Sequence, residues 1–571
     1  MFSKENDKKD GLNKIITIEL ALLVSLVPLL PSTLRPQYYL TLRTLASEII
    51  VAVLGLTLIY GWAAGKIKGK LCAGHILMIA FIVSGAISIS YCIDRVTALQ
   101  SLHLHFCWLI VTFAGYYLFR DKKTFLNCLK WIAPGAVIIC AYGIWEKFST
   151  GASQISSTMG FPTLYGGYLL CALFLFQCGM ITAQKKNERI IFAFTLCLLV
   201  INLCYCGSLA AWFSFITGEG LLLMNYFSEF WKKKNINRTY RIKTIFIISF
   251  LLITILVLFT QNNLKRDITS KKESLQMRLD RWEIAWNMVW EKPLLGFGSG
   301  QYEVYFPHYR AKAGAANETW ERDIDIEVPV NTENIALMLL AEQGVFAFLI
   351  FAGIFIWTLY IVFSRSASAA PWKHQTGIHL GCGIIAILGY SIFHFPFHTP
   401  GVWGIIWTMV SIIWAVLQIN GKAETSEEHK IKSVGNKSLL LMPFLIPAAL
   451  LFIYLLYLPF GYWTNDIQFK KGEVYAINGD IEKFRRAFEK TYPFVPRTWR
   501  YYYYYGEGLL RSGEEEEAIV KFKVAEKFRP YSIIILRKIQ QALFFSKQTN
   551  TEEFRLYKKR IKDLTDANQR I

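Results

Sequence analysis

Long apolar runs, separated by short charged loops, fill the first 460 residues of this chain. Backbone groups inside a bilayer can bond only to one another, so a run that crosses it must form a helix, which takes about 17–25 apolar residues. The pattern therefore predicts an all-α, polytopic membrane helical bundle of 12–13 spans over residues 1–460. The candidate spans are 14–31, 46–65, 71–91, 101–119, 125–145, 163–183, 189–206, 208–228, 243–260, 335–363, 376–393, 400–418 and 439–460.

Basic residues favour one set of the loops between these spans. With a cytoplasmic N-terminus, the inside loops carry clusters such as 120–123 and 232–234, whereas the short outside loops carry little beyond Arg95 and Lys147. Loops rich in lysine and arginine tend to stay in the cytoplasm. The one long polar segment, 261–333, is therefore expected to be extracytoplasmic, and an odd number of spans places the C-terminus outside as well.

Composition agrees with a membrane protein and narrows its chemistry. Of the 571 residues, 53% are hydrophobic, which is above the usual share of a soluble domain. The formal net charge of +20 comes from runs between apolar spans, so we interpret it as loop charge rather than a nucleic-acid surface. The eleven cysteines lie in or beside the spans without zinc-ligand spacing, and we expect them to be small buried hydrophobes. We expect neither a metal nor a cofactor.

After residue 460 the composition becomes that of a soluble helical domain. An offset of 34 residues aligns Gly472 with Gly506 and Phe488 with Phe522. Small residues where two helices cross, together with an aromatic knob, are typical of the tetratricopeptide repeat. We predict a tetratricopeptide-like domain over 461–571, with a generic helical hairpin domain as the alternative. So few repeats are expected to dock on another surface, such as the membrane domain.

The long outside segment holds the first candidate residues for chemistry. Arg278, Arg281 and Trp282 belong to a predicted helix over 277–290, and Arg310 follows later in the segment. An arginine just outside a bilayer can bind a phosphate with two parallel hydrogen bonds. An arginine in such a place can also simply reach the lipid headgroups or solvent.

Three glycines follow Pro293 in a G-x-G-x-G pattern, namely Gly296, Gly298 and Gly300. No strand–helix unit surrounds them, so they are not a dinucleotide fingerprint. Such glycines allow either a tight backbone turn or a close approach of backbone N–H groups to an anion. The sequence leaves both uses open.

Polar residues also mark the point where the chain re-enters the membrane. Asn331, Glu333 and Asn334 stand at the end of the outside segment, and Glu342 lies within the next apolar span. A carboxylate in a span is costly to bury, so Glu342 is either a functional group or the partner of an arginine in the loop.

Three histidines are expected on the outside. His308 lies within the long segment, and His394 and His398 lie in the short loop between two later spans. A histidine with an ordinary pKa can take a proton from a sugar hydroxyl. A histidine at a membrane interface can instead serve as an amphipathic anchor.

Together these residues resemble the O-antigen ligase and polymerase superfamily of polytopic glycosyltransferases. The resemblance rests on Arg278-x-x-x-Trp282, on the run 293–300, on Asn334 and on Glu342-x-Gly344, with a weaker likeness over 159–169. It implies a glycan carried on undecaprenyl diphosphate, arginines that neutralise the diphosphate, and an acceptor hydroxyl that attacks the anomeric carbon. It also implies that no nucleotide and no obligatory metal is needed.

The resemblance assigns expected roles to these residues. Arg278 would face the diphosphate, with Glu333, Asn334 and His308 as the other catalytic candidates. The superfamily's ligases usually have a histidine just before the equivalent of Asn334, which this chain lacks, so Glu333 or His308 would act as the base. A serine–arginine pair common in the family reads Ser208-Leu209 here. The expected substrate-binding residues are Arg281, Trp282, Gly296, Gly298, Gly300, Arg310, Asn331 and Glu342.

The sequence thus predicts an O-antigen ligase-like or polymerase-like enzyme of the bacterial inner membrane. Its N-terminus would be cytoplasmic and its C-terminal domain periplasmic. Its partners would be an undecaprenyl-diphosphate-linked glycan, a glycan, lipid or protein acceptor, the bilayer, and other surface-glycan assembly proteins bound through the repeats. The alternatives are a polytopic transporter and a catalytically inactive scaffold of polysaccharide assembly.

Overall fold

The structure is a computed structural model that describes residues 2–30, 42–67, 71–232, 268–313, 331–366, 369–418 and 497–565, together with most of 453–490. Within these residues every regular element is helical, so the prediction of an all-α chain is confirmed. The predicted spans 243–260 and 439–460 lie outside the described residues, apart from a few positions at the end of the second.

Eleven of the described helices coincide with predicted spans. Eight of them, α1–α7 and α14, are long and apolar enough to cross a membrane, which confirms a multi-pass membrane protein. α16 is shorter but apolar, and α8 and α15 fall on the predicted spans 208–228 and 376–393. The bounds are α1 Phe2–Leu29, α2 Leu42–Ala63, α3 Ala73–Ser88, α4 Arg95–Leu118, α5 Lys122–Thr150, α6 Pro162–Thr182, α7 Lys186–Cys206, α8 Leu209–Lys232, α14 Ile335–Arg365, α15 Pro371–Tyr390 and α16 Trp403–Gln418.

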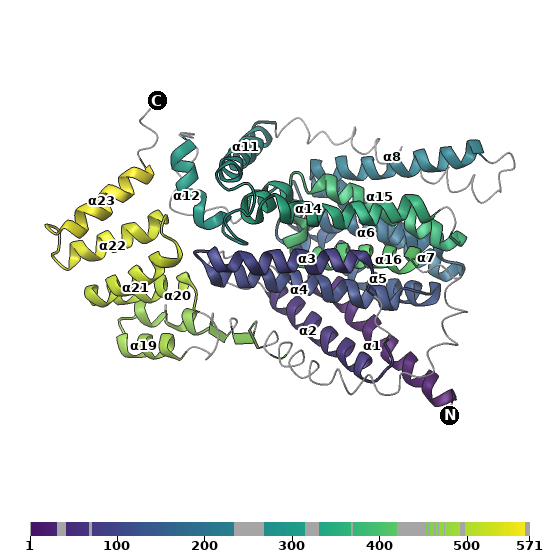
Figure 1. Ribbon diagram of the computed structural model, residues 1–571, viewed down its shortest axis with the longest axis horizontal. Helices are drawn as coiled ribbons and strands as arrows, with labels where there is room; N and C mark the ends of the chain where they lie inside the picture. The colour runs from purple at the N-terminus through teal and green to yellow at the C-terminus, as the bar shows by residue number, and fades with distance from the viewer. Residues whose placement is uncertain are drawn as a thin grey trace.

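These helices run roughly side by side as one bundle (Figure 1). α16 lies in its centre, packed against α4 and α15, and its tryptophans Trp403, Trp407 and Trp414 are fully buried. The Trp414 indole N–H donates to Thr358 Oγ1 of α14 at 2.9 Å. A helix that is apolar all round is expected in such a position, because no side of it meets a polar phase.

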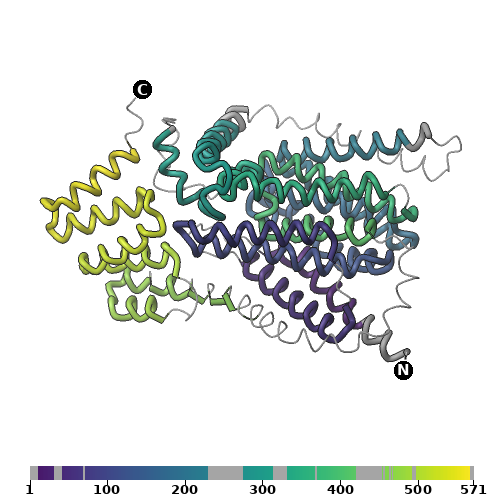
Figure 2. The backbone as a smooth tube through the Cα atoms, viewed as in Figure 1, coloured from purple at the N-terminus to yellow at the C-terminus, as the bar shows by residue number. Residues whose placement is uncertain are grey.

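The described helices of the long polar segment and the C-terminal helices gather at one end of the bundle, which we name the loop end (Figure 2). The N-terminus lies at the opposite end. That the long segment and the C-terminal domain share one face of the membrane stays a prediction. The helices at the loop end are α11 Ile268–Glu291, α12 Tyr302–Ala313, α19 Ile481–Glu489, α20 Trp499–Arg511, α21 Glu515–Phe528, α22 Ile533–Phe545 and α23 Glu552–Thr565.

The C-terminal helices pack as successive neighbours, α20 on α21, α21 on α22 and α22 on α23. A Cβ atom at Gly472 would lie 2.5 Å from the ring of Phe488, and one at Gly506 would lie 2.8 Å from the ring of Phe522. The aligned glycines therefore both make room for the aligned phenylalanines. The assignment to the tetratricopeptide family stays a prediction.

Candidate functional site

Helix α11 packs against the protein with one face and carries its arginines on another. Its side chains Ile284, Ala285 and Met288 are buried in a small cluster with residues of α12 and α14. Arg281 and Trp282 come three and four positions after Arg278, so both lie beside it on the helix surface. That face meets the turn 331–334, where the chain returns to the membrane.

Glu333 joins both arginines. Its Oε2 accepts from Arg278 Nε at 2.7 Å, and its Oε1 accepts from Arg281 Nη1 at 2.6 Å. The backbone of Glu333 is left-handed, with φ of 55°, and its N–H donates to Asn331 Oδ1 at 3.0 Å. The indole N–H of Trp282 donates to the Thr332 carbonyl at 3.1 Å. The turn and α11 are therefore locked to each other.

The two arginines also determine the charge of Glu333. Burial alone would raise the pKa of this carboxyl, but the hydrogen bond from Arg278 and the charges of both arginines outweigh it and leave the pKa below its ordinary value. A carboxylate with a cation on each oxygen is stable as the anion and is a poor acceptor for a proton. Its clearest role in this geometry is to fix the arginines.

Arg278 also lines a cavity of about 590 Å³. The wall opposite α11 comes from the start of α6, from the junction of α7 and α8, and from the loop after α15. The segments 159–169 and 208–209, which lie far apart in the sequence, thus reach the same cavity. Its other lining residues include Thr163, Ser208, Leu209, Phe213, Phe393 and His394.

The turn 296–300, which we name the glycine turn, packs against a break in α14. Gly344 has φ of 76° and ψ of −177°, a conformation open essentially only to glycine, and it interrupts the helix there. The Phe297 N–H donates to the Ala341 carbonyl at 3.0 Å, and the Gly298 N–H donates to the Glu342 carbonyl at 2.5 Å. Gly296 packs so closely that a Cβ would collide with the backbone of Glu342.

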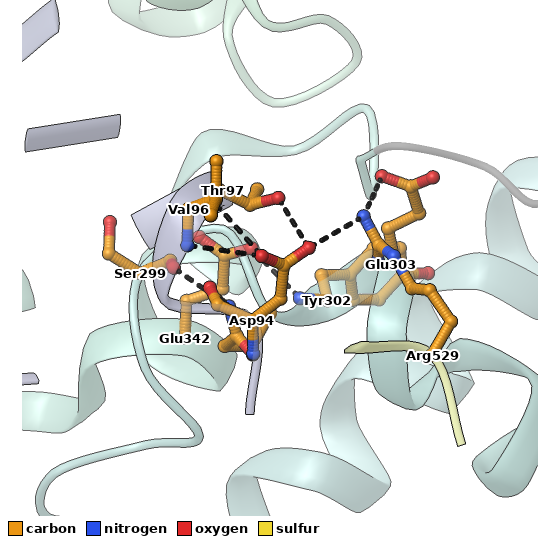
Figure 3. Close-up of polar contacts among 9 residues, drawn as sticks. Asp94, Val96, Thr97, Ser299, Tyr302, Glu303, Glu342 and Arg529 are labelled. Carbon is orange, nitrogen blue, oxygen red and sulfur yellow. Dashed lines mark hydrogen bonds and ion pairs between the residues drawn. The ribbon is translucent and has the colours of Figure 1, made fainter. Parts of the chain in front are cut away.

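Glu342 completes this contact from within α14 (Figure 3). Its Oε1 accepts from the Tyr302 N–H at 3.0 Å, the contact that Figure 3 draws. Its Oε2 accepts from the Gly300 N–H at 2.8 Å. The side chain is buried and bonds to backbone amides rather than to an arginine of the loop. The turn's amide groups are thereby engaged within the protein.

The remaining predicted residues have separate settings. Asn334 caps α14, with its Oδ1 accepting from the Leu337 N–H at 3.1 Å. His308, on α12, lies against the ring of Tyr531 from the C-terminal helices, with 4.8 Å between ring centroids. Arg310 is on the same helix, where burial lowers its pKa. Among the described residues, no hydrogen bond or ion pair links His308 or Arg310 to the Arg278–Glu333 pair.

One contact at the loop end had no signal in the sequence. Arg529, in the C-terminal helices, inserts between two acidic residues of the membrane domain (Figure 3). Its Nη2 lies 3.1 Å from Glu303 Oε2 and 3.5 Å from Asp94 Oδ2. Asp94 is the N-cap of α4, and Glu303 lies in the first turn of α12. The C-terminal helices therefore dock on the membrane domain beside the glycine turn.

The comparisons with known proteins bear on this same region. None of the curated proteins matches the chain. A family model described as O-antigen ligase matches residues 192–352, which include α7, α8, α11, α12 and the broken first part of α14. The match supports a membrane enzyme that transfers glycans. Residues 192–352 thus match the O-antigen ligase family, which supports the resemblance of the chain to the O-antigen ligase and polymerase superfamily.

Proposed function

We propose that this protein transfers or polymerises a glycan from undecaprenyl diphosphate onto an acceptor hydroxyl, at the outer face of the bacterial inner membrane. The loop end would then face the periplasm and the N-terminus the cytoplasm. The observation that carries the proposal is the position of Arg278, at the wall of a largely apolar cavity between membrane helices.

The cavity combines the two surfaces that a lipid diphosphate needs. Arg278 uses only its Nε on Glu333 among the described residues, so its two terminal nitrogens remain as a fork for a phosphate group. Phe213 and Leu209 line the cavity and are 79% and 46% exposed, on helix surfaces that would meet lipid. An isoprenoid chain could leave the cavity across these side chains into the bilayer.

Glu333 supports this donor site by fixing the direction of both arginines before a substrate arrives. Preorganised cations stabilise the charge that grows on a leaving diphosphate without a cost of reorientation during the reaction. We assign Trp282, Asn331 and Asn334 to the same task, because their hydrogen bonds define the turn that carries Glu333. The glycine turn and Glu342 hold that assembly against α14.

The proposal is tested by Arg278→Ala in purified protein, with undecaprenyl diphosphate as the binding probe. Loss of a charge-assisted hydrogen bond to phosphate should weaken binding by roughly tenfold to a hundredfold. Arg278→Lys keeps the charge but not the fork, so its binding should be intermediate. Lys312→Ala is the matched control, since Lys312 is a basic residue of the loop end that pairs with Glu291 on the surface.

Transfer is then followed in cells that lack the chromosomal copy, by the length and amount of surface glycan on gels. We expect Arg278→Ala to abolish glycan transfer while the protein still inserts, and Lys312→Ala to retain it. Normal surface glycan in the Arg278→Ala strain would refute the enzyme proposal and favour the transporter or the scaffold.

A further inference from the structure

His394 lies on the cavity wall across from α11 and belongs to the short loop after α15. Its side chain is 5% exposed, and its ring lies against that of Tyr390 with centroids 4.6 Å apart. The Tyr390 hydroxyl donates in turn to the carbonyl of Thr163, another lining residue. The imidazole is therefore held in place at the same cavity as Arg278.

The ring nitrogens of His394 are not engaged by the fold. Among the residues that the structure describes, no hydrogen bond occupies either of them, and neither is sealed in the core away from open space. His398, four positions later, is different because it packs against His105 and Trp108. His308 lies against Tyr531. Of these three histidines, His394 is the one that lines the cavity.

The surroundings keep this imidazole in its neutral form. Burial and the charge of Arg278 lower the pKa of His394 to about 4, and Glu333 opposes them only in part. The ionisable groups that face it are Arg278 from α11, Glu333 from the turn and the phenol of Tyr390 from α15. The lowered pKa makes this imidazole a weak base, as it does the Glu333 carboxylate. The two groups differ in their acceptor atoms, because among the described residues both oxygens of Glu333 already accept from arginines and the ring nitrogens of His394 do not.

We propose that His394 is the general base that takes the proton of the acceptor hydroxyl. The inference rests on the proposed function and adds the acceptor side of the same cavity. The acceptor oxygen forms a bond to the anomeric carbon as the bond from that carbon to the diphosphate oxygen breaks. The electron pair leaves with the diphosphate beside Arg278, and the hydroxyl proton moves to a ring nitrogen of His394.

The test compares His394→Gln with the wild type in membrane vesicles that contain the native donor and acceptor. The release of undecaprenyl diphosphate in a single turnover measures the chemical step. Loss of a general base should slow this step on the order of 10²–10⁴-fold. Binding of undecaprenyl diphosphate should change by less than about twofold, since the donor side is intact. His374→Gln, in the first turn of α15 at the far end of that helix, is the matched control and should keep the wild-type rate.

The pH dependence separates a base from a merely structural residue. Wild-type turnover should be nearly constant from about pH 6 to 8, because His394 is already neutral there. In His394→Gln, hydroxide must remove the proton, so the residual rate should rise by up to about tenfold per pH unit. A structural defect would slow turnover equally at each pH.

The outcomes keep this inference distinct from the proposed function. If His394→Gln turns over at the wild-type rate while Arg278→Ala loses donor binding, His394 is not the base and the donor site stands. If the variant is slow with no change in its pH profile, or binds undecaprenyl diphosphate as weakly as Arg278→Ala, the base is also refuted. If wild-type protein itself neither binds the donor nor releases the diphosphate, the proposed function fails.

Discussion

Replacing Arg529 with alanine is expected to loosen the docking of the C-terminal helices on the loop end. The guanidinium is almost fully buried between Asp94 and Glu303, and it lies over the ring of Trp499 at 5.6 Å. The alanine variant would leave both carboxylates at the interface without their cation. If the C-terminal helices separated from the membrane domain, the two carboxylates would return to water.

The size of the effect follows from the burial of the three groups. Removing one partner from a buried ion pair costs about 3–5 kcal/mol, because the other charge stays desolvated. The Glu303 side chain is 14% exposed, so we take the lower end of this range of energies, about 3 kcal/mol. Since every 1.4 kcal/mol is tenfold in an equilibrium constant, the undocked state should gain roughly two orders of magnitude in population.

Hydrogen–deuterium exchange of the protein in lipid nanodiscs measures this population. The amides of α12 and of the residues around Asp94 should exchange faster in Arg529→Ala, while the bundle core stays protected. In Arg529→Lys these amides should exchange at a rate between those of the wild type and Arg529→Ala, because lysine keeps the charge but not the shape of the guanidinium. Lys527→Ala, an exposed position two residues earlier, is the control. Wild-type exchange of α12 in Arg529→Ala would refute the argument that this contact holds the domain.

Three further outcomes are expected from the site. Gly344→Ala should prevent folding or insertion, because the new Cβ would collide with the Leu294 carbonyl in a conformation that disfavours side chains, whereas Gly353→Ala on the same helix should be tolerated in an expression and thermal-unfolding assay. Glu342→Gln should lower stability by about 1–3 kcal/mol, since an amide nitrogen would then face a backbone N–H, and equal melting temperatures would contradict this. The pKa of Glu333 lies below its ordinary value, so its ion pairs should add stability above about pH 4 and lose it as the pH falls through the folded pKa. Glu333→Gln should therefore melt lower than wild type at pH 7 and approach it in acid, and a constant difference across that range would count against the ion pairs.

The membrane helices could be predicted because the bilayer imposes one local rule. A spanning segment must satisfy its own backbone, so length and apolarity alone identify it. Helices α1–α7 and α14 meet the rule and lie where the apolar runs predicted them. The spacing of Arg278, Arg281 and Trp282 is equally local, since residues three and four apart share a helix face. Their ion pairs with Glu333 were not predicted, because Glu333 lies at the far end of the same polar segment.

The glycine turn shows where local rules stop. A positive φ at Gly296, Gly298 and Gly300 suits both an anion-binding loop and a loop that packs on another backbone. The difference lies in what faces the amide groups, and here that is the break in α14 near Gly344. No pattern within 293–300 contains this information. The contact of Arg529 with Asp94 is harder still to predict from the sequence, because it joins positions far apart in the chain through side chains alone.

The substitution of Glu333 for the family's histidine has a consequence that only the assembled site reveals. An acid at that position draws Arg278 and Arg281 onto its two oxygens, which would fix the arginines of the proposed donor site and leaves neither oxygen free to act as a base. A residue that accepts a proton beside those cations must itself be neutral, because a second anion would be drawn into the same pairs. Histidine meets that requirement, since burial favours its uncharged form. In the proposed mechanism His394 supplies such a group from a different loop, so the acid at 333 and the histidine at 394 would act together.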